Sequence, residues 1–339
     1  MPNGPHIVII GAGLIGLSTA EALCARGAQV TVLDAQGGPA LGASFSNSGM
    51  IHPSQAWPWF EGDEKTAKAV LKLAERSASL IKKNCDRLDV SRGQGCYQIF
   101  DTAAEAEKLS ACYDILGVQA ETRTVLERTA LYFPDDGFGN AYDYACALQA
   151  ALARQGVVFR FGVRDLHVNK ALHVTLEGDR LTCDAVVIAA GLGSADLLKP
   201  LGIDLPLQGL RGHALNFDRP DAPLPDAPIM HAASRSALTV FERHVRLSGT
   251  VGEDNPEVLR EIWRSLAPDI IDLLGAPTYK WTADRPMSAL GCPFMCETSV
   301  KGLWVNTGHG HMGWTLCAGS GALMADMVMQ GVEAPQFAF

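Results

Sequence analysis

Residues 6–34 read HIVIIGAGLIGLSTAEALCARGAQVTVLD, and the prediction of the fold starts from them. Residues 6–10 form a short run rich in β-branched side chains, typical of a buried parallel strand. Apolar residues then recur at helical spacing over residues 14–26, and Gly27 stands where a glycine commonly ends a helix. Because a second strand is predicted over residues 29–33, the segment has the form of a βαβ unit.

The turn between the first strand and the helix is Gly11-Ala12-Gly13-Leu14-Ile15-Gly16, which fits G-x-G-x-x-G. Its first glycine permits a tight turn, its second lets a pyrophosphate approach the backbone, and its third lets helix and strand pack closely. The N-terminus of the helix offers unpaired N–H groups and a positive dipole end to phosphate. Asp34, followed by Ala35, is placed to bind ribose hydroxyls. Taken alone, this glycine pattern is also compatible with a tight turn that binds no ligand. Strand, helix and carboxylate together predict a dinucleotide site without distinguishing FAD from NAD.

The composition excludes several classes of protein. The 339 residues carry 28 Lys and Arg against 37 Asp and Glu, a formal net charge of −9, which argues against a nucleic-acid partner. No apolar run approaches the roughly 20 residues of a membrane span, and no signal-peptide pattern is found. Nine scattered cysteines indicate reduced thiols, so we expect a cytoplasmic protein. Lysines on the helix expected over residues 64–85 leave peripheral contact with the inner membrane open.

A second G-x-G-x-x-G stands at Gly308-His309-Gly310-His311-Met312-Gly313, after a strand predicted over residues 304–307 and before a helix predicted over residues 314–330. No further strand or ribose carboxylate follows it, which argues against a second dinucleotide site. We expect this helix instead to point its N-terminus at the electron-rich end of an isoalloxazine ring. The pattern therefore favours a flavin.

The remaining pattern predicts an interrupted domain. Residues 37–62 carry no periodicity and are expected to form a long functional loop. Alternating strands between residues 206 and 281 predict an antiparallel sheet. The expected fold class is α/β, a Rossmann-like FAD-binding domain with an inserted α+β substrate domain built on an antiparallel sheet. The FAD-binding domain is assigned residues 1–84, 140–205 and 282–339, and the substrate-binding domain residues 85–139 and 206–281.

Several segments resemble the FAD-dependent D-amino acid dehydrogenases of bacteria, within the wider D-amino acid oxidase and glycine oxidase family. These segments are residues 11–16 with Asp34, Ser44-Phe45-Ser46-Asn47-Ser48-Gly49, Asp284-Arg285-Pro286-Met287, and residues 306–315. The resemblance covers nearly the whole chain. It implies that the cofactor is FAD and that the protein is an amino acid dehydrogenase or oxidase.

The reaction implied by this resemblance is oxidation of the Cα–N bond of amino acids, above all D-amino acids. Hydride would pass to flavin N5, and the imino acid would hydrolyse to a 2-oxo acid and ammonia. The partners are then a small amino acid substrate and an electron acceptor, quinone or oxygen, which the sequence does not identify. Two alternatives stay open: an enzyme for glycine-like, N-methyl or cyclic secondary amino acids, and an inactive flavin-binding subunit of a heteromer.

The resemblance also assigns residues. The expected cofactor contacts are Gly11, Gly13, Leu14, Ile15, Gly16, Asp34, Ala35, Ser44, Ser46, Asn47, Gly49, Met50, Val163, Ala190, Gly191, Gly308, Gly310, His311, Met312, Gly313, Trp314 and Thr315. Arg285 matches the arginine that holds the substrate carboxylate, a role that suits the planar, bidentate guanidinium.

His52 is the second candidate catalytic residue. It would lie near the flavin and bind substrate or help to deprotonate its amine, since the ordinary pKa of histidine suits neutral pH. A structural histidine on a loop is the alternative. No metal site is expected, because His309 with His311 and Cys292 with Cys296 lack a second pair at zinc spacing.

Overall fold

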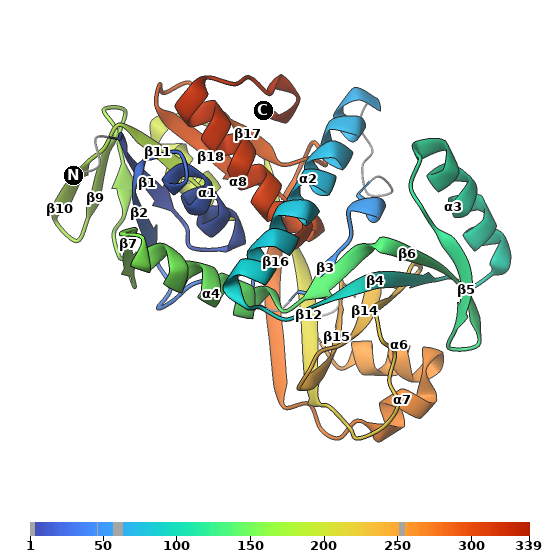
Figure 1. Cartoon of the computed structure of the whole chain (residues 1–339). Coiled ribbons are helices and arrows are strands. Elements are labelled where there is room, and N and C mark those ends of the chain that lie inside the picture. Colours follow the sequence, from blue (N-terminus) through green and yellow to red (C-terminus); the bar gives the residue numbers. More distant parts are fainter. Residues whose placement is uncertain (1–3, 46, 57–63, 251–254) are drawn as a thin grey trace.

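The computed structural model describes residues 4–45, 47–56, 64–250 and 255–339 (Figure 1). One of its sheets has six strands in the order β17-β18-β11-β1-β2-β7. Their bounds are β1 His6–Ile10, β2 Gln29–Asp34, β7 Val158–Phe161, β11 Ala185–Ile188, β17 Phe294–Glu297 and β18 Leu303–Thr307. All neighbours pair in parallel except β17 with β18. The predicted βαβ unit is thus confirmed at the centre of a doubly wound sheet.

Alternate side chains of β1 enter different hydrophobic cores. Ile7 and Ile9 pack toward helices, whereas Val8 and Ile10 pack toward a small three-stranded sheet. The helices are α1 Leu14–Cys24, α2 Glu64–Leu88, α4 Ala141–Arg154 and α8 Gly313–Gln330. The opposite face carries β8 His167–Val168, β9 His173–Leu176, β10 Asp179–Thr182, α5 Gly193–Leu198 and the 3-10 turn η3 Lys199–Leu201. Both faces of the six-stranded sheet are therefore covered.

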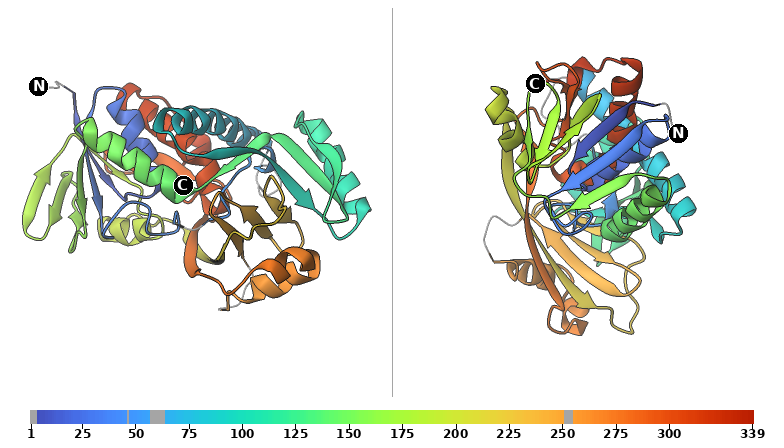
Figure 2. Two further views of the ribbon diagram at one scale, coloured as in Figure 1. Left: turned by 60° about the horizontal axis from the view of Figure 1, so that its bottom comes forward. Right: turned by 90° about the vertical axis from the view of Figure 1, so that its left-hand side faces the viewer.

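A nine-stranded sheet forms the rest of the molecule, below and to the right in Figure 1 and seen from two other sides in Figure 2. Its order is β16-β12-β15-β14-β13-β4-β6-β3, and β5 pairs with β6. The strands are β3 Met50–Ile51, β4 Arg92–Ile99, β5 Glu121–Val125, β6 Arg128–Gly139, β12 Leu207–Asp218, β13 Ile229–His231, β14 Ser236–Val240, β15 His244–Gly249 and β16 Tyr279–Ser288. Helices α3 Ala103–Leu116, α6 Val258–Leu266 and α7 Pro268–Leu273 accompany this sheet, and η1 Pro53–Gln55, η4 Gly310–Met312 and η5 Pro335–Phe337 are short 3-10 turns.

The predicted fold class is confirmed, with additions. Strands β4 and β6 were not expected, because β4 begins with a polar and glycine-rich sequence and β6 is interrupted by Pro134, Asp135 and Asp136, so that neither shows apolar alternation. The segment expected to be an aperiodic loop contains β3 and η1 among its described residues. The assigned domain limits stay a prediction: β16 crosses the limit at residue 282, and β3 pairs in the nine-stranded sheet. No helix of the described ranges has both the length and the apolar character to cross a bilayer.

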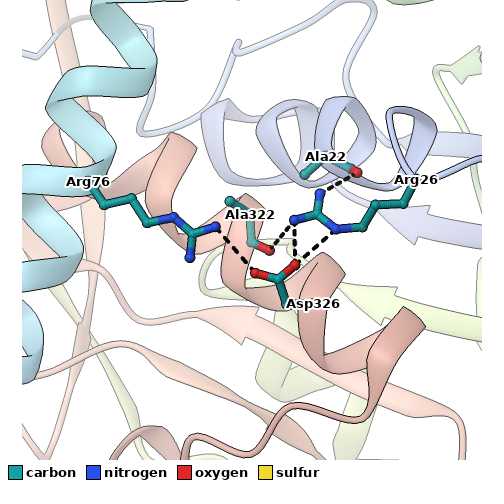
Figure 3. A network of polar contacts seen from close by, with 5 residues as sticks. All are labelled: Ala22, Arg26, Arg76, Ala322 and Asp326. Atoms are coloured by element: carbon teal, nitrogen blue, oxygen red, sulfur yellow. Dashed lines mark hydrogen bonds and ion pairs between the residues drawn. The ribbon is translucent and has the colours of Figure 1, made fainter.

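Helix α8, which comes late in the sequence, packs on α1 and α2, which come early in it. A Cβ on Gly321 would lie 2.4 Å from the backbone carbon of Ser18, so only glycine permits this close approach to α1. Beside it, Arg26 Nε donates to Asp326 Oδ1 at 3.0 Å, and Arg76 of α2 lies 3.3 Å from Asp326 Oδ2 (Figure 3). One carboxylate therefore links α8 with α2 and with the turn that follows α1.

We expect Asp326→Ala to lower the free energy of unfolding by about 1–2 kcal/mol, because it leaves two arginines without their carboxylate. The value is modest because Arg76 is nearly half exposed and its pairing is screened by solvent. Thermal unfolding measures the effect, with Lys68→Ala as control, since that variant breaks only the exposed pair with Glu64. Equal losses in the two variants would contradict a structural role for Asp326.

Candidate active site

A cleft of about 470 Å³ lies at the carboxyl ends of the parallel strands. It is lined by the segments that follow β1, β2, β11 and β18 and by the first residues of α1 and α8. Strand β1 is flanked by β2 on one side and β11 on the other, which makes this edge the crevice where doubly wound sheets bind ligands. The two glycine motifs, far apart in the sequence, thus meet in one cleft.

Most residues assigned to the cofactor line this cleft. They are Gly11, Gly13, Leu14, Ile15, Asp34, Ala35, Ser44, Asn47, Val163, Ala190, Gly191, Gly310, His311, Gly313 and Trp314. The N-terminus of α1 has Gly13 as its cap and that of α8 has Met312, and neither cap supplies a side-chain hydrogen bond. A cleft with two helix N-termini whose N-cap residues make no side-chain hydrogen bond fits an elongated ligand carrying phosphates and an electron-rich ring.

Asp34 is fixed at the end of β2 by two backbone groups. Its Oδ2 accepts from the N–H of Ala12 at 2.6 Å, and its Oδ1 accepts from the N–H of Gln36 at 2.7 Å. The carboxylate therefore braces the first glycine turn while it lines the cleft. The N–H of Leu14 donates to Ser44 Oγ at 3.2 Å, which ties the following loop to the start of α1.

Other assigned residues lie behind the cleft wall. Gly16 packs closely on the first turn, where a Cβ would lie 1.8 Å from the carbonyl oxygen of Gly11. The carbonyl of Gly49 accepts from Trp314 Nε1 at 3.2 Å. Gly308 and Met312 line a small cavity of about 40 Å³. Met50 and Thr315 are buried near His52, and Ser46 lies outside the described residues.

A second chamber of about 270 Å³ adjoins the cleft. Asn47, Arg285 and His311 line both spaces, and His52 and Met50 line the chamber. Its remaining wall comes from the nine-stranded sheet and its connections: Ser48, Leu210, Met230, Arg235, Ser236, Ala237, Ser248, Gly249, Thr250 and Met287. The candidate catalytic residues therefore lie at the junction between the nucleotide cleft and a space of small-molecule size.

Arg285 projects from β16 and lies flat against β12. A Cβ on Gly212 would come within 2.6 Å of its Cζ, so this glycine makes room for the guanidinium. Arg285 Nη1 donates to Thr250 Oγ1. In the described part of the chain the group has no ion-pair partner, and its burial lowers the pKa of Arg285 to about 10. It is therefore a cation at neutral pH, held beside the chamber.

The two histidines are neutral. Burial lowers the pKa of His52 to about 4, and burial together with Arg285 lowers the pKa of His311 to about 3. The expectation that the pKa of His52 suits neutral pH is wrong, because desolvation lowers this pKa and no acidic partner among the described residues offsets it. Its Nδ1 has no hydrogen-bond partner among the described residues, and its backbone N–H donates to Thr315 Oγ1 at 3.1 Å. The imidazole of His52 is thus neutral and can accept a hydrogen bond through its unprotonated nitrogen.

Asp136 anchors the turn that follows His52. Its Oδ2 accepts from Ser54 Oγ at 2.6 Å, and its Oδ1 accepts from the N–H of Ser54 at 3.2 Å. Desolvation of this buried carboxyl raises its pKa to about 7. The folded protein therefore holds a proton that the unfolded chain releases above about pH 4.

Because of that proton, the free energy of unfolding falls by roughly 2–4 kcal/mol as the pH rises from about 4 to about 7. We expect Asp136→Asn to remove this dependence. Denaturant unfolding of wild type and variant between pH 5 and 8 measures it, with the exposed Asp135→Asn as matched control. A pH-independent difference between wild type and Asp136→Asn would contradict the raised pKa.

Many residues of the chamber wall were not predicted from the sequence. Met230, Ala237 and Ser248 come from antiparallel strands whose register brings them together. No motif marks them, and only the strand pairing reveals which alternate side chains face inward. The space that Gly212 leaves for Arg285 likewise depends on the pairing of β12 with β16.

Known proteins share this architecture. A sequence model of the DAO family, described as FAD dependent oxidoreductase, matches residues 6–327. Glycine oxidase from Bacillus cereus ATCC 14579 has 24% identity and a TM-score of 0.82, over 98% of this chain and 97% of that chain. Iminodiacetate oxidase from Chelativorans sp. BNC1 has 18% identity and a TM-score of 0.84, over 98% of each chain. L-proline dehydrogenase from P. horikoshii has 18% identity and a TM-score of 0.83, over 98% of this chain and 95% of that chain.

Proposed function

Since this chain belongs to the DAO family of FAD-dependent oxidoreductases, we propose that it oxidises the Cα–N bond of amino acids, with D-amino acids as the preferred class. The substrate loses two electrons and becomes an imino acid, which water hydrolyses to a 2-oxo acid and ammonia. FAD, when bound, supplies the hydride acceptor. The residues of the chain then have to bind the substrate, orient its α-carbon and exclude water.

The position and charge of Arg285 are the main support for this proposal. Its guanidinium lies at the boundary of cleft and chamber, charged and without an ion-pair partner among the described residues. A carboxylate in the chamber would complete this pair in bidentate geometry and fix the adjoining α-carbon toward the cleft. Gly212 and Thr250 hold the guanidinium before substrate arrives.

His52 and His311 suit the amino group of the same substrate. Both imidazoles are neutral, so they can accept a hydrogen bond from an amine. The nearby charge of Arg285 disfavours a second cation, and the buried walls formed by Met50 and Met230 lower the local polarity. These residues therefore favour the neutral amine, the form from which hydride departs.

Anaerobic reduction of the flavin tests the proposal. We expect a panel of D-amino acids to bleach the flavin absorbance of the FAD-loaded protein, and amines of equal size without a carboxylate to leave it unchanged. Bleaching only by glycine, N-methylglycine or proline would replace the D-amino acid class with the alternative class of glycine-like, N-methyl or cyclic secondary amino acids. No bleaching by any amine would contradict the proposal and favour an inactive subunit.

We predict that the electron acceptor is either a quinone or oxygen. Reoxidation of the reduced protein with dioxygen alone, followed by assay of hydrogen peroxide, separates these two. Rapid reoxidation with stoichiometric peroxide would favour an oxidase, and reoxidation only by an added quinone would favour a dehydrogenase.

A further inference from the structure

A chain of hydrogen-bonded side chains begins at the chamber wall and ends at the surface. Ser236 is buried and lines the chamber, and its Oγ lies 2.7 Å from Ser234 Oγ. Ser234 Oγ lies 2.8 Å from His231 Nδ1, and His231 Nε2 lies 3.1 Å from Asp101 Oδ1. The side chain of Asp101 is 54% exposed and lines a surface groove of about 570 Å³. This hydrogen-bonded chain therefore connects the chamber with water.

The backbone of three strands holds the hydrogen-bonded chain together. His231 ends β13 and Ser236 begins β14, and the two residues pair directly across the hairpin. Ser234 lies in the turn between them. The N–H of Ala232 donates to the carbonyl oxygen of Ile99 at 3.1 Å, which fixes this turn beside the end of β4, two residues before the aspartate. The pairing of β13 with β14 and β4 therefore keeps all four side chains in line.

The acidic end of the chain sets the direction of its hydrogen bonds. A carboxylate only accepts, so Asp101 accepts from the Nε2–H of His231. In the neutral ring the other nitrogen, Nδ1, then accepts from the hydroxyl of Ser234, and Ser234 Oγ accepts from Ser236. A lone pair on Ser236 Oγ can accept in turn from a group in the chamber. Every hydrogen bond of the chain therefore points from the chamber toward the surface.

The proposed oxidation has to release a proton from the substrate. An α-amino acid carries an ammonium group at neutral pH, whereas hydride departs from the neutral amine. The imidazoles of His52 and His311 are poor acceptors for this proton, because burial holds the pKa of His52 at about 4 and, with the charge of Arg285, that of His311 at about 3. Arg285 itself is already charged. A path to an acceptor beyond the chamber wall therefore serves the reaction.

We infer that this hydrogen-bonded chain is a proton relay, which carries the ammonium proton of the substrate from the chamber to water. The inference rests on the proposed function. The N–H bond of the ammonium breaks as Ser236 Oγ takes the proton, and the hydroxyl proton of Ser236 passes to Ser234. The hydroxyl proton of Ser234 passes to His231 Nδ1, and the Nε2 proton passes to Asp101 and on to water. One proton enters the chain, one leaves it, and no electron moves in this step.

Replacement of His231 by glutamine tests the relay. The amide can donate to Asp101 and accept from Ser234, but it cannot pass a proton between them. With the best amino acid substrate of the FAD-loaded wild type, we expect His231→Gln to slow anaerobic flavin reduction about 100-fold at pH 7. At about pH 10 the substrate amine is mostly neutral, so the variant should approach the rate of wild type. Added imidazole should partly restore the rate at pH 7, because it can accept the proton in place of the relay.

Three further variants separate proton transfer from structure. Ser234→Ala interrupts the chain in its middle and should show the same loss at pH 7 and the same recovery at high pH. Ser234→Thr keeps a hydroxyl at this position and should retain most of the rate. His167→Gln, which removes an exposed histidine of β8, should behave as wild type. A loss in His231→Gln that is equal at both pH values, or no loss at pH 7, would overturn the relay.

Failure of the relay and failure of the proposed function give different results. If an amino acid reduces the flavin of wild type and of His231→Gln at equal rates at pH 7, the relay is wrong and the oxidation stands. If no amino acid reduces the flavin of wild type, the oxidation is wrong, and the relay falls with it because the chamber then has no substrate proton to release.

Discussion

Replacement of Arg285 by glutamine is expected to raise the KM for an amino acid substrate by about 30-fold to 4,000-fold. The guanidinium is charged, packed against Gly212 and without an ion-pair partner in the described part of the chain, so a bound carboxylate would depend on it. Loss of one member of a desolvated charge pair costs about 2–5 kcal/mol, which corresponds to this range. Steady-state kinetics and the substrate dependence of anaerobic flavin reduction measure the effect.

Arg211→Gln is the matched control. Arg211 lies on the neighbouring strand and pairs with the carboxylate of Asp284 at 3.0 Å, where it is about half exposed. Its loss should change KM little, because it does not line the chamber. Arg285→Lys should fall between wild type and Arg285→Gln, since it keeps a charge and loses the bidentate fork. Unchanged KM in Arg285→Gln would show that the carboxylate binds elsewhere.

Gly13→Val is expected to weaken FAD binding at least about 100-fold, or ~2.7 kcal/mol, without unfolding the protein. Gly13 has a φ of −71°, which any residue adopts, and its added Cβ would meet only Ser44 Oγ, at 3.2 Å. The valine methyl groups would instead occupy the cleft, where backbone and phosphate have to approach. Flavin content after purification and titration of the apoprotein with FAD measure the loss.

Gly37→Val is the control for this variant. Gly37 follows the same strand β2, and a Cβ there meets nothing within 4 Å, so flavin should be retained. Gly16→Ala makes a useful contrast, because its Cβ would lie 1.8 Å from the carbonyl oxygen of Gly11 and should disrupt the fold itself. Full flavin content in Gly13→Val would mean that the first glycine turn does not hold the cofactor.

Local pattern explains what could be predicted. The segment up to Asp34 combines strand, glycine turn, helix and carboxylate in consecutive residues, and each part appears where the pattern places it. The second glycine motif was expected to complete the same site, and it lines the same cleft. Both inferences needed only neighbours in the sequence and the rule that ligands bind at the carboxyl ends of parallel strands.

The chamber could not be predicted in this way. Strand β4 begins Arg92-Gly-Gln-Gly, which has no apolar alternation, and its pairing with β6 follows from tertiary context. The low pKa of His52 results from burial by residues far apart in the chain, so the sequence suggested the wrong titration range. Arg235, another residue of the chamber wall, lies in a turn that no sequence motif marks.

The packing of α8 on α1 has a consequence for biosynthesis. Arg26 and Asp326 are 300 positions apart, yet their side chains are hydrogen-bonded in the folded chain. During translation the first glycine turn leaves the ribosome long before the helix that completes its cleft. A nascent chain that still lacks α8 has only part of a flavin site, so cofactor loading has to await the synthesis of residues 313–330.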